Sequence, residues 1–178
     1  MSALYTFVLK AALGFAPVAA FASGDCNLPP AEPVTDVLGL TVAYGESAGD
    51  RRLLRILSNG QIFVPLYDAM LETQISREAL QALIDWMVQE QGFLSLSWTT
   101  IKADLRRPPP GANGALPIPP HEDGLGSFIT LTVPDCSHSV VVRDSAMIST
   151  GRPDVEALQR FRAIELRLLE IVTRLQTR

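Results

Sequence analysis

The sequence predicts an α+β domain in which two helices pack on one face of an antiparallel sheet built from two hairpin units. Asn59-Gly60 lies between two apolar runs, and this is a strong hairpin signal because both central residues of a type I′ turn need positive φ. A second pair of strand-like runs meets at Pro134-Asp135. Helical periodicity follows each hairpin, so the expected order is β-β-β-α-β-β-α.

The first hairpin unit is expected to begin at residue 37. Residues 37–44 alternate well enough to form a first strand, and strands at 51–58 and 61–65 should flank the Asn-Gly turn. A short helix over Leu53–Leu57 is the alternative reading of the middle segment.

A helix is expected over residues 77–91. Ser76 is a suitable N-cap, Glu78 lies in the first turn, and Gly92 follows the last turn. Its apolar positions recur at helical spacing and are Leu80, Leu83, Ile84, Met87 and Val88.

A long irregular connection is expected over residues 99–127, because its proline-rich part at 107–120 suits neither a helix nor a central strand. Strands at 128–133 and 139–143 should then form the second hairpin.

The last element is expected to be a long helix at 154–176, with Pro153 at its first position. Leu166 and Leu169 lie off its apolar stripe and are a candidate partner-facing patch, although scattered exposed leucines are the favoured interpretation. The stripe consists of Ala157, Leu158, Phe161, Ile164, Leu168, Ile171, Val172 and Leu175.

The first 22 residues have the pattern of a cleaved export signal. Lys10 precedes an uncharged apolar run that ends in Ala20-Phe21-Ala22, with small residues at the positions that signal peptidase reads. The run is too short for a membrane-spanning helix unless Lys10 enters the hydrocarbon. An uncleaved anchor and a buried N-terminal helix are the weaker readings, and Asp25 argues against lipid attachment at Cys26.

The mature chain should therefore comprise an extended segment at 23–36 and a single domain at 37–178. Arginine greatly outnumbers lysine, which suggests a GC-rich bacterial genome and, with the signal, a periplasmic location. Cleavage removes one lysine and no acid, so the formal net charge moves from −4 to −5. An acidic domain without a basic stripe is a poor candidate for nucleic acid, and no membrane span is expected after cleavage.

The two cysteines, Cys26 and Cys136, are expected to form a disulfide in an oxidising compartment. In the chain-entropy model, a disulfide that closes so long a loop raises the free energy of unfolding by up to about 4.7 kcal/mol. Two free thiols, or a metal-binding or catalytic role, are the alternatives.

A weak catalytic signal lies at Gly45-Glu46-Ser47-Ala48-Gly49. This segment resembles the nucleophile elbow of carboxylesterases, which would make Ser47 the nucleophile and His121 or His138 its base. Few residues precede it, however, and that fold places strands and an oxyanion loop first. A glycine-flanked hairpin loop is the favoured interpretation.

No cofactor or metal is expected, because the acidic and histidine residues around 121–138 match no standard zinc spacing. The favoured binding surface is instead the proline-rich loop with its neighbouring aromatic residue, since exposed loops on a rigid scaffold commonly carry recognition. The residues chosen for it are Trp98, Leu116, Pro117 and Ile118. A loop that only covers a sheet face is the favoured interpretation of this segment.

Residues 53–63, followed by Ile75-Ser76-Arg77-Glu78-Ala79-Leu80, resemble exported bacterial domains of unknown function. In that family a strand-turn-strand unit precedes a helix, a further hairpin and a second helix. The resemblance covers about residues 37–175 and implies the architecture, without lending any catalytic residue.

These observations together predict a periplasmic binding or accessory module for another protein or envelope component, acting as a monomer or a weak homodimer. A serine hydrolase using Ser47 is one alternative. A structural or assembly subunit that associates through the C-terminal helix is the other.

Mass spectrometry of the native protein checks the export signal. We expect the mature chain to begin at Ser23, because signal peptidase cuts after the small residue of the Ala-Phe-Ala pattern. A native protein that retains Met1 or Ser2 in a cytosolic fraction would contradict this expectation.

Overall fold

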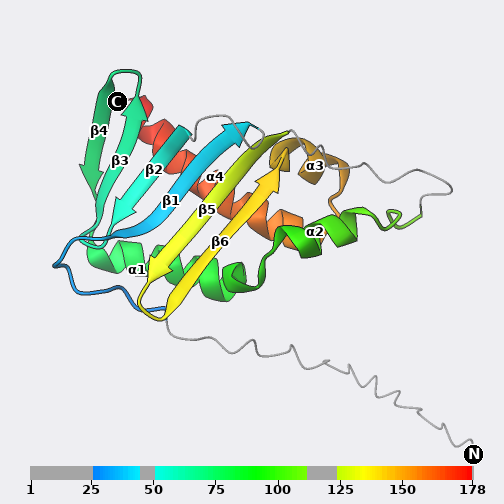
Figure 1. Ribbon diagram of the computed structural model, residues 1–178, viewed down its shortest axis with the longest axis horizontal. Coiled ribbons are helices and arrows are strands. Elements are labelled where there is room, and N and C mark those ends of the chain that lie inside the picture. Colours follow the sequence, from blue (N-terminus) through cyan, green and yellow to red (C-terminus); the bar gives the residue numbers. More distant parts are fainter. Residues whose placement is uncertain (1–25, 45–50, 112–123, 178) are drawn as a thin grey trace, which may run out of the picture.

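Six antiparallel strands form one sheet in the order β4-β3-β2-β1-β5-β6 (Figure 1). The computed structural model describes residues 26–44, 51–111 and 124–177. Within these residues the predicted α+β class is confirmed, although there is one strand more than predicted and there are four α-helices in place of two. The strands are β1 (Asp36–Tyr44), β2 (Arg51–Leu57), β3 (Gln61–Leu66), β4 (Ala69–Gln74), β5 (Leu125–Val133) and β6 (Cys136–Arg143).

The helices lie between and after the strands. They are α1 (Arg77–Asp85), α2 (Trp98–Leu105), α3 (Ser145–Gly151) and α4 (Glu156–Gln176). A π-helical turn at Trp86–Glu90 extends α1, and a 3₁₀ turn at Phe93–Ser95 leads towards α2.

The predicted hairpin at Asn59-Gly60 is confirmed, and the alternative helix over Leu53–Leu57 is wrong. Gly60 has φ 87°, and a Cβ atom there would lie 2.2 Å from the carbonyl oxygen of Ile75. Only glycine therefore fits this turn. The side chain of Asn59 accepts a hydrogen bond from the backbone N–H of Gln61, which fixes the start of β3.

Strand β4 was absent from the prediction. It pairs along its whole length with β3 after the two-residue turn Tyr67-Asp68, in which Tyr67 has φ 51° without being glycine or asparagine. Leu71 packs against the core, while Met70, Glu72 and Gln74 are exposed. An edge strand needs little apolar sequence, so neither the composition of β4 nor the sequence of its turn indicated a strand.

The predicted first helix is confirmed, since α1 and the following π-helical turn together span 77–90. Ser76 is the N-cap and accepts a hydrogen bond from the backbone N–H of Ala79. Gly92 follows with φ 60°, the left-handed conformation in which helices commonly end.

The prediction of an irregular connection over 99–127 is wrong at both ends. Helix α2 starts at Trp98, where the Ser97 side chain accepts a hydrogen bond from the N–H of Thr100. Ile101 and Leu105, four residues apart, bury the inner side of this short helix. Strand β5 already begins at Leu125, three residues earlier than predicted.

The start predicted for the last helix is also wrong. Helix α4 begins at Glu156, and Pro153 lies in a turn between α4 and α3, a helix that the sequence analysis missed. The apolar stripe of α4 is correct at its buried positions, which include Phe161, Ile164 and Leu168. The stripe also contains the buried Glu165, which no apolar pattern predicts.

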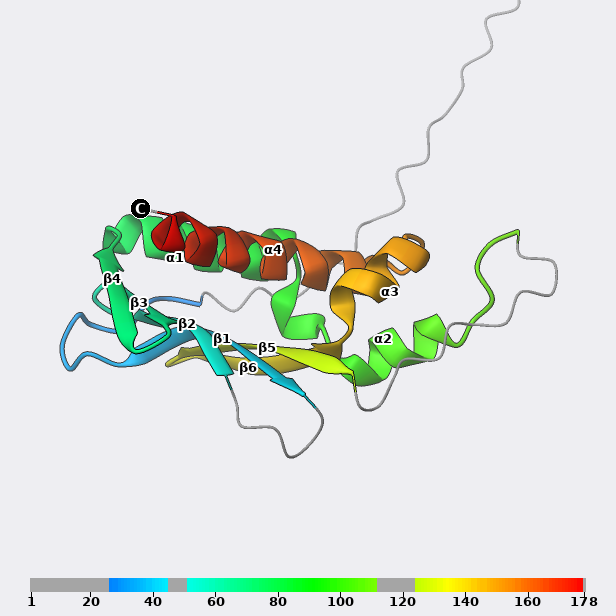
Figure 2. The same cartoon turned by 90° about the horizontal axis from the view of Figure 1, so that it is seen from above.

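Helices α1 and α4 both lie over one face of the sheet (Figure 2), and the core fills the space between the two layers. Helix α2 packs beside the edge strand β6 and also contacts α4. As far as the described residues extend, the opposite face of the sheet carries no helix. None of the described helices combines the length and the apolar composition that a membrane crossing requires.

The predicted disulfide between Cys26 and Cys136 is confirmed. It joins residues 110 positions apart, with a Cα–Cα distance of 5.4 Å. Residues 26–35 form no helix or strand and run past α1, where the Gln81 side chain donates to the Cys26 carbonyl and accepts from the N–H of Leu28, each at 2.9 Å. The disulfide and Gln81 thus hold the N-terminal segment against the helix layer.

Replacing both cysteines, C26S/C136S, is expected to lower the free energy of unfolding by up to about 4.7 kcal/mol, because the unfolded chain regains the entropy of a loop of roughly 100 residues. Denaturant titration of the variant and of the wild type measures this loss. The reduced wild type is the matched control and should unfold at the same denaturant concentration as the variant. Equal midpoints for the oxidised wild type and the variant would contradict the prediction.

Candidate functional site

Glu165 is 3% exposed, and its side chain joins three elements at one end of the sheet. Its two carboxylate oxygens accept hydrogen bonds from Ser127 of β5, from Ser145 of α3 and from Arg162 one turn earlier in α4. The bonds from Ser145 and Arg162 are each 2.6 Å long. A buried carboxylate is costly unless it is paired and hydrogen-bonded, and here it is both.

A pocket of about 390 Å³ opens beside this carboxylate, between α3, α4 and the neighbouring ends of β1, β2 and β5. We call it the α3–α4 pocket. Its polar residues are Ser127, Asp144, Ser145, Arg162 and Glu165. Its apolar residues are Leu40, Val42, Leu53, Leu125, Ala146, Met147 and Leu169.

A β-bulge contributes to the apolar wall of the α3–α4 pocket. The register between β1 and β2 shifts between Leu40 and Thr41, and this shift leaves Leu53 as the extra residue of β2. Leu54 is fully buried in the core, and Leu53 beside it lines the pocket. The bulge therefore supplies the pocket with an apolar side chain that strict alternation would not place there.

Asp144 adopts a strained backbone conformation at the pocket wall. It has φ 48° and directly precedes α3, and one of its carboxylate oxygens accepts a hydrogen bond from the N–H of Leu125 at 3.1 Å. A Cβ atom on Gly124 would lie 1.9 Å from the other carboxylate oxygen, so a larger residue there would require the Asp144 side chain to move. Such strain in a non-glycine residue is commonly found at functional sites.

The partner-facing patch predicted at Leu166 and Leu169 can be compared with the exposure of the apolar side chains near the pocket. Met147, which lines the pocket, is 55% exposed, and Leu166 on α4 is 50% exposed. Leu169 packs against the core and lines the pocket. Leu169 therefore belongs to the pocket, and Leu166 is the more exposed of the two leucines.

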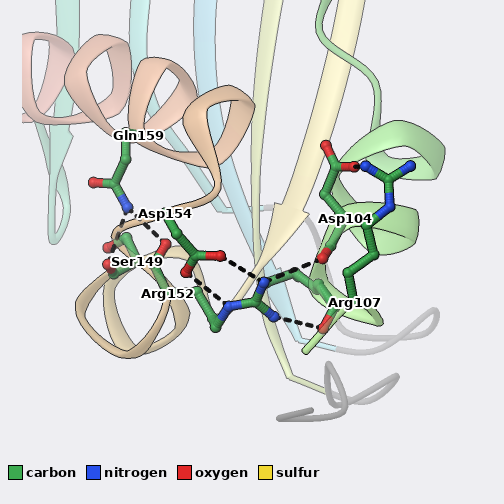
Figure 3. A network of polar contacts seen from close by, with 7 residues as sticks. Asp104, Arg107, Ser149, Arg152, Asp154 and Gln159 are labelled. Carbon is green, nitrogen blue, oxygen red and sulfur yellow. Dashed lines mark hydrogen bonds and ion pairs between the residues drawn. The ribbon is translucent and has the colours of Figure 1, made fainter. Parts of the chain in front are cut away.

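A second polar network fixes the turn that leads from α3 into α4 (Figure 3). Arg152 is 2% exposed, and its guanidinium group pairs with Asp154 through two hydrogen bonds of 2.9 and 2.8 Å. It also donates to the carbonyl oxygens of Asp104 and Leu105 at the end of α2. These carbonyls lie at the C-terminal end of α2, where the helix dipole favours a cation, so Arg152 caps α2 and ties it to the turn before α4.

Gln159 completes this network from the first turn of α4. Its amide donates to the carbonyl oxygens of Ser149 and Arg152 (Figure 3), at 3.0 and 3.1 Å. The hydrogen bonds between Arg152 and Asp154 lower the pKa of the Asp154 carboxyl and raise that of the Arg152 guanidinium. The network thereby holds α3, one wall of the pocket, in place.

The histidine proposed as a catalytic base, His138, has a structural environment. Its Nε2 atom lies 2.8 Å from the carbonyl oxygen of Leu96, to which it donates, and its ring meets the Phe93 ring edge-on at 5.1 Å. Through the strand register it lies level with Leu38, whereas the predicted elbow follows Tyr44 at the other end of β1. None of the contacts that His138 makes with the described residues supports a role in catalysis.

Trp98, chosen as a recognition residue, begins α2 and packs partly against the core. Its partners in that prediction, Leu116, Pro117 and Ile118, lie outside the described residues, as do Ser47 and His121 and residues 1–25 with the export signal. Cys136 is in the disulfide and so cannot be a thiolate ligand. Among the described residues, no three His, Cys, Asp or Glu side chains are grouped to hold a metal ion.

Sequence reasoning missed Glu165, Arg162 and Asp144 as site residues. A carboxylate within the apolar stripe of α4 was the available signal, since such a residue needs a buried partner. A scan against protein-family models finds no match to this chain, and a search of curated proteins finds none either.

Replacing Glu165 with leucine is expected to lower the free energy of unfolding by about 3 kcal/mol, because it leaves Ser127, Ser145 and Arg162 without their shared acceptor. Chemical denaturation measures the loss. Glu170 on the same helix is exposed, so E170L is the control and should change the stability by about 0.5 kcal/mol or less. Equal stabilities of E165L and E170L would show that the buried carboxylate does not hold these elements together.

The Arg152–Asp154 pair predicts a pH dependence. Because the pKa of Asp154 is lowered on folding, its contribution to stability is present above its ordinary value of about 4 and is lost as the pH falls through the folded value. D154N should therefore be less stable than the wild type at pH 7, and the difference should shrink in acid. Thermal unfolding of D154N and the wild type from pH 7 into acid measures this difference. D68N, which changes an aspartate in an exposed turn, is the control. A difference that does not change with pH would contradict the assignment.

Proposed function

We propose that this protein is an exported binding or accessory module that takes a small amphiphilic ligand in the α3–α4 pocket. One observation carries the proposal, namely an apolar pocket of about 390 Å³ into which a few polar groups converge. Pockets of this size and lining are the usual sites of small-molecule binding. The apolar part of the ligand would lie against Leu53, Met147 and Leu169, and its polar end would meet Asp144 and Arg162.

The construction of the pocket supports this function. The bonds between Glu165 and its two serine partners, together with the Arg152 network, fix α3 relative to α4, so the walls are held before a ligand arrives. Preorganised walls lower the entropic cost of binding. The exposed Met147 gives the pocket an adaptable apolar side chain, as methionine does at many binding surfaces.

Export to the periplasm is part of the same proposal. The Cys26–Cys136 disulfide supports an oxidising compartment, where such bonds form and persist. The apolar leader that precedes Ser23 in the sequence supports the same location. We infer that the module serves another component of the envelope by binding or presenting its ligand there.

N-Phenyl-1-naphthylamine, a neutral apolar dye that fluoresces in apolar surroundings, tests the proposal. We expect one dye molecule to bind per protein and A146W to reduce the affinity about tenfold or more, since Ala146 lines the pocket and is exposed. Fluorescence titration measures the affinity. A103W is the matched control, because Ala103 is an exposed alanine on α2 that does not line the pocket, and it should bind the dye like the wild type. Absence of binding, or equal loss in both variants, would refute the site.

A further inference from the structure

The face of the sheet opposite α1 and α4 carries a second hollow, which is independent of the proposed α3–α4 pocket. The strand register places one residue of every strand in a single row across this face. In strand order the row is Glu72, Phe63, Arg55, Gly39, Thr130 and Ser139. A cavity of about 230 Å³ lies on this row around Gly39, between β2 and β5.

Gly39 creates the depth of this hollow. A Cβ atom built there would come no closer than 3.8 Å to any non-neighbouring atom, and that atom is the carbonyl oxygen of Leu54. The space above Gly39 is therefore open, and a larger side chain would fill it. The packing of the strand does not require glycine at position 39. The effect of this glycine is to leave the hollow unfilled.

One wall of the hollow is cationic. Among the described residues, Arg52 and Arg55 of β2 line it together with a single carboxylate, that of Asp36. Asp36 accepts from the Nε atom of Arg55 and lies 3.9 Å from a terminal nitrogen of Arg52. All three side chains are substantially exposed, so two guanidinium groups share one acid, in a chain whose formal net charge is −4.

The ring of Phe63 supports this wall from the next strand. It lies under the guanidinium group of Arg55, with 5.9 Å between the carbon of that group and the ring centroid. A cation–π contact of this kind limits where Arg55 extends. It leaves Arg55 beside the hollow, where it also pairs with Asp36.

The other wall of the hollow carries hydroxyl groups. Thr130 and Thr132 of β5 line it, and the Thr130 hydroxyl lies 3.2 Å from that of Ser139 on β6. Thr132 pairs in register with Ser137, so four hydroxyl-bearing residues gather on these two strands, and all four are exposed. A hydroxyl group both donates and accepts hydrogen bonds.

We propose that this hollow binds an acidic glycan, a sugar chain that bears carboxylate groups. A carboxylate would lie against Arg52 and Arg55, since a guanidinium group forms strong paired hydrogen bonds to a carboxylate. Sugar hydroxyls, which donate and accept as threonine hydroxyls do, would face Thr130 and Thr132. The chain would pass over Gly39, where no side chain obstructs it. An acidic peptide offers the charge without the hydroxyls, so the hydroxyl wall favours the glycan.

Calorimetric titration with oligogalacturonate, a chain of carboxylated sugars, tests this assignment on the full mature protein. We expect binding that weakens as salt is added, because exposed charges are screened. A neutral maltooligosaccharide of equal length and a polyglutamate peptide should each bind about tenfold more weakly or not at all. No binding of oligogalacturonate, or equal affinity for either comparison ligand, would overturn the proposal.

Two variants locate the binding. R52Q/R55Q should weaken the affinity for oligogalacturonate about tenfold, and G39L should weaken it similarly by filling the hollow. R174Q, which removes an exposed arginine from α4, is the control and should leave the affinity unchanged. Thermal unfolding checks that each variant folds, and if G39L does not fold, R52Q/R55Q decides. If R52Q/R55Q bound oligogalacturonate as tightly as the wild type, the proposed site would be wrong. This result does not depend on whether the dye binds in the α3–α4 pocket.

Discussion

The carboxylate of Glu165 is the interaction on which the arrangement of this end of the molecule depends. Helix α4 supplies the charge from within its buried stripe, between Ile164 and Leu168. Strand β5 and helix α3 each supply a serine hydroxyl, and Arg162 supplies the countercharge. Since an unsatisfied buried carboxylate would cost several kcal/mol, these three elements must come together in one way. The α3–α4 pocket lies beside the junction.

The sheet gives the molecule two different faces. Helices α1 and α4 cover one of them, and the apolar residues of β1, β2 and β5 face these helices. The opposite face places arginine, glycine and threonine residues in register across the strands. A single two-layer domain can therefore offer an apolar pocket between its layers and a polar hollow on its open side. These sites suit ligands of different chemistry.

Much of the fold could be predicted from sequence, because Asn59-Gly60, the Ser76 cap and the stripe of α4 are local signals. The disulfide followed from the presence of only two cysteines. Strand β4 was missed because its sequence is largely polar, and helices α2 and α3 were missed because each is short and is stabilised by contacts distant in sequence. Arg152, for example, caps α2 from 47 positions away. The site could not be predicted either, because Ser127, Ser145 and Glu165 are distant in sequence and meet only in the folded chain.

The most direct test of the α3–α4 pocket as a binding site is a methyl-resolved NMR titration of the full protein with N-phenyl-1-naphthylamine. The methyl groups of Leu53, Met147 and Leu169 should show contacts to the dye, because these residues line the pocket. The methyl group of Met70, exposed on the edge strand β4, should show none. Contacts at Met70, or at methyl groups remote from α3 and α4 with none at Leu53 and Leu169, would contradict the account.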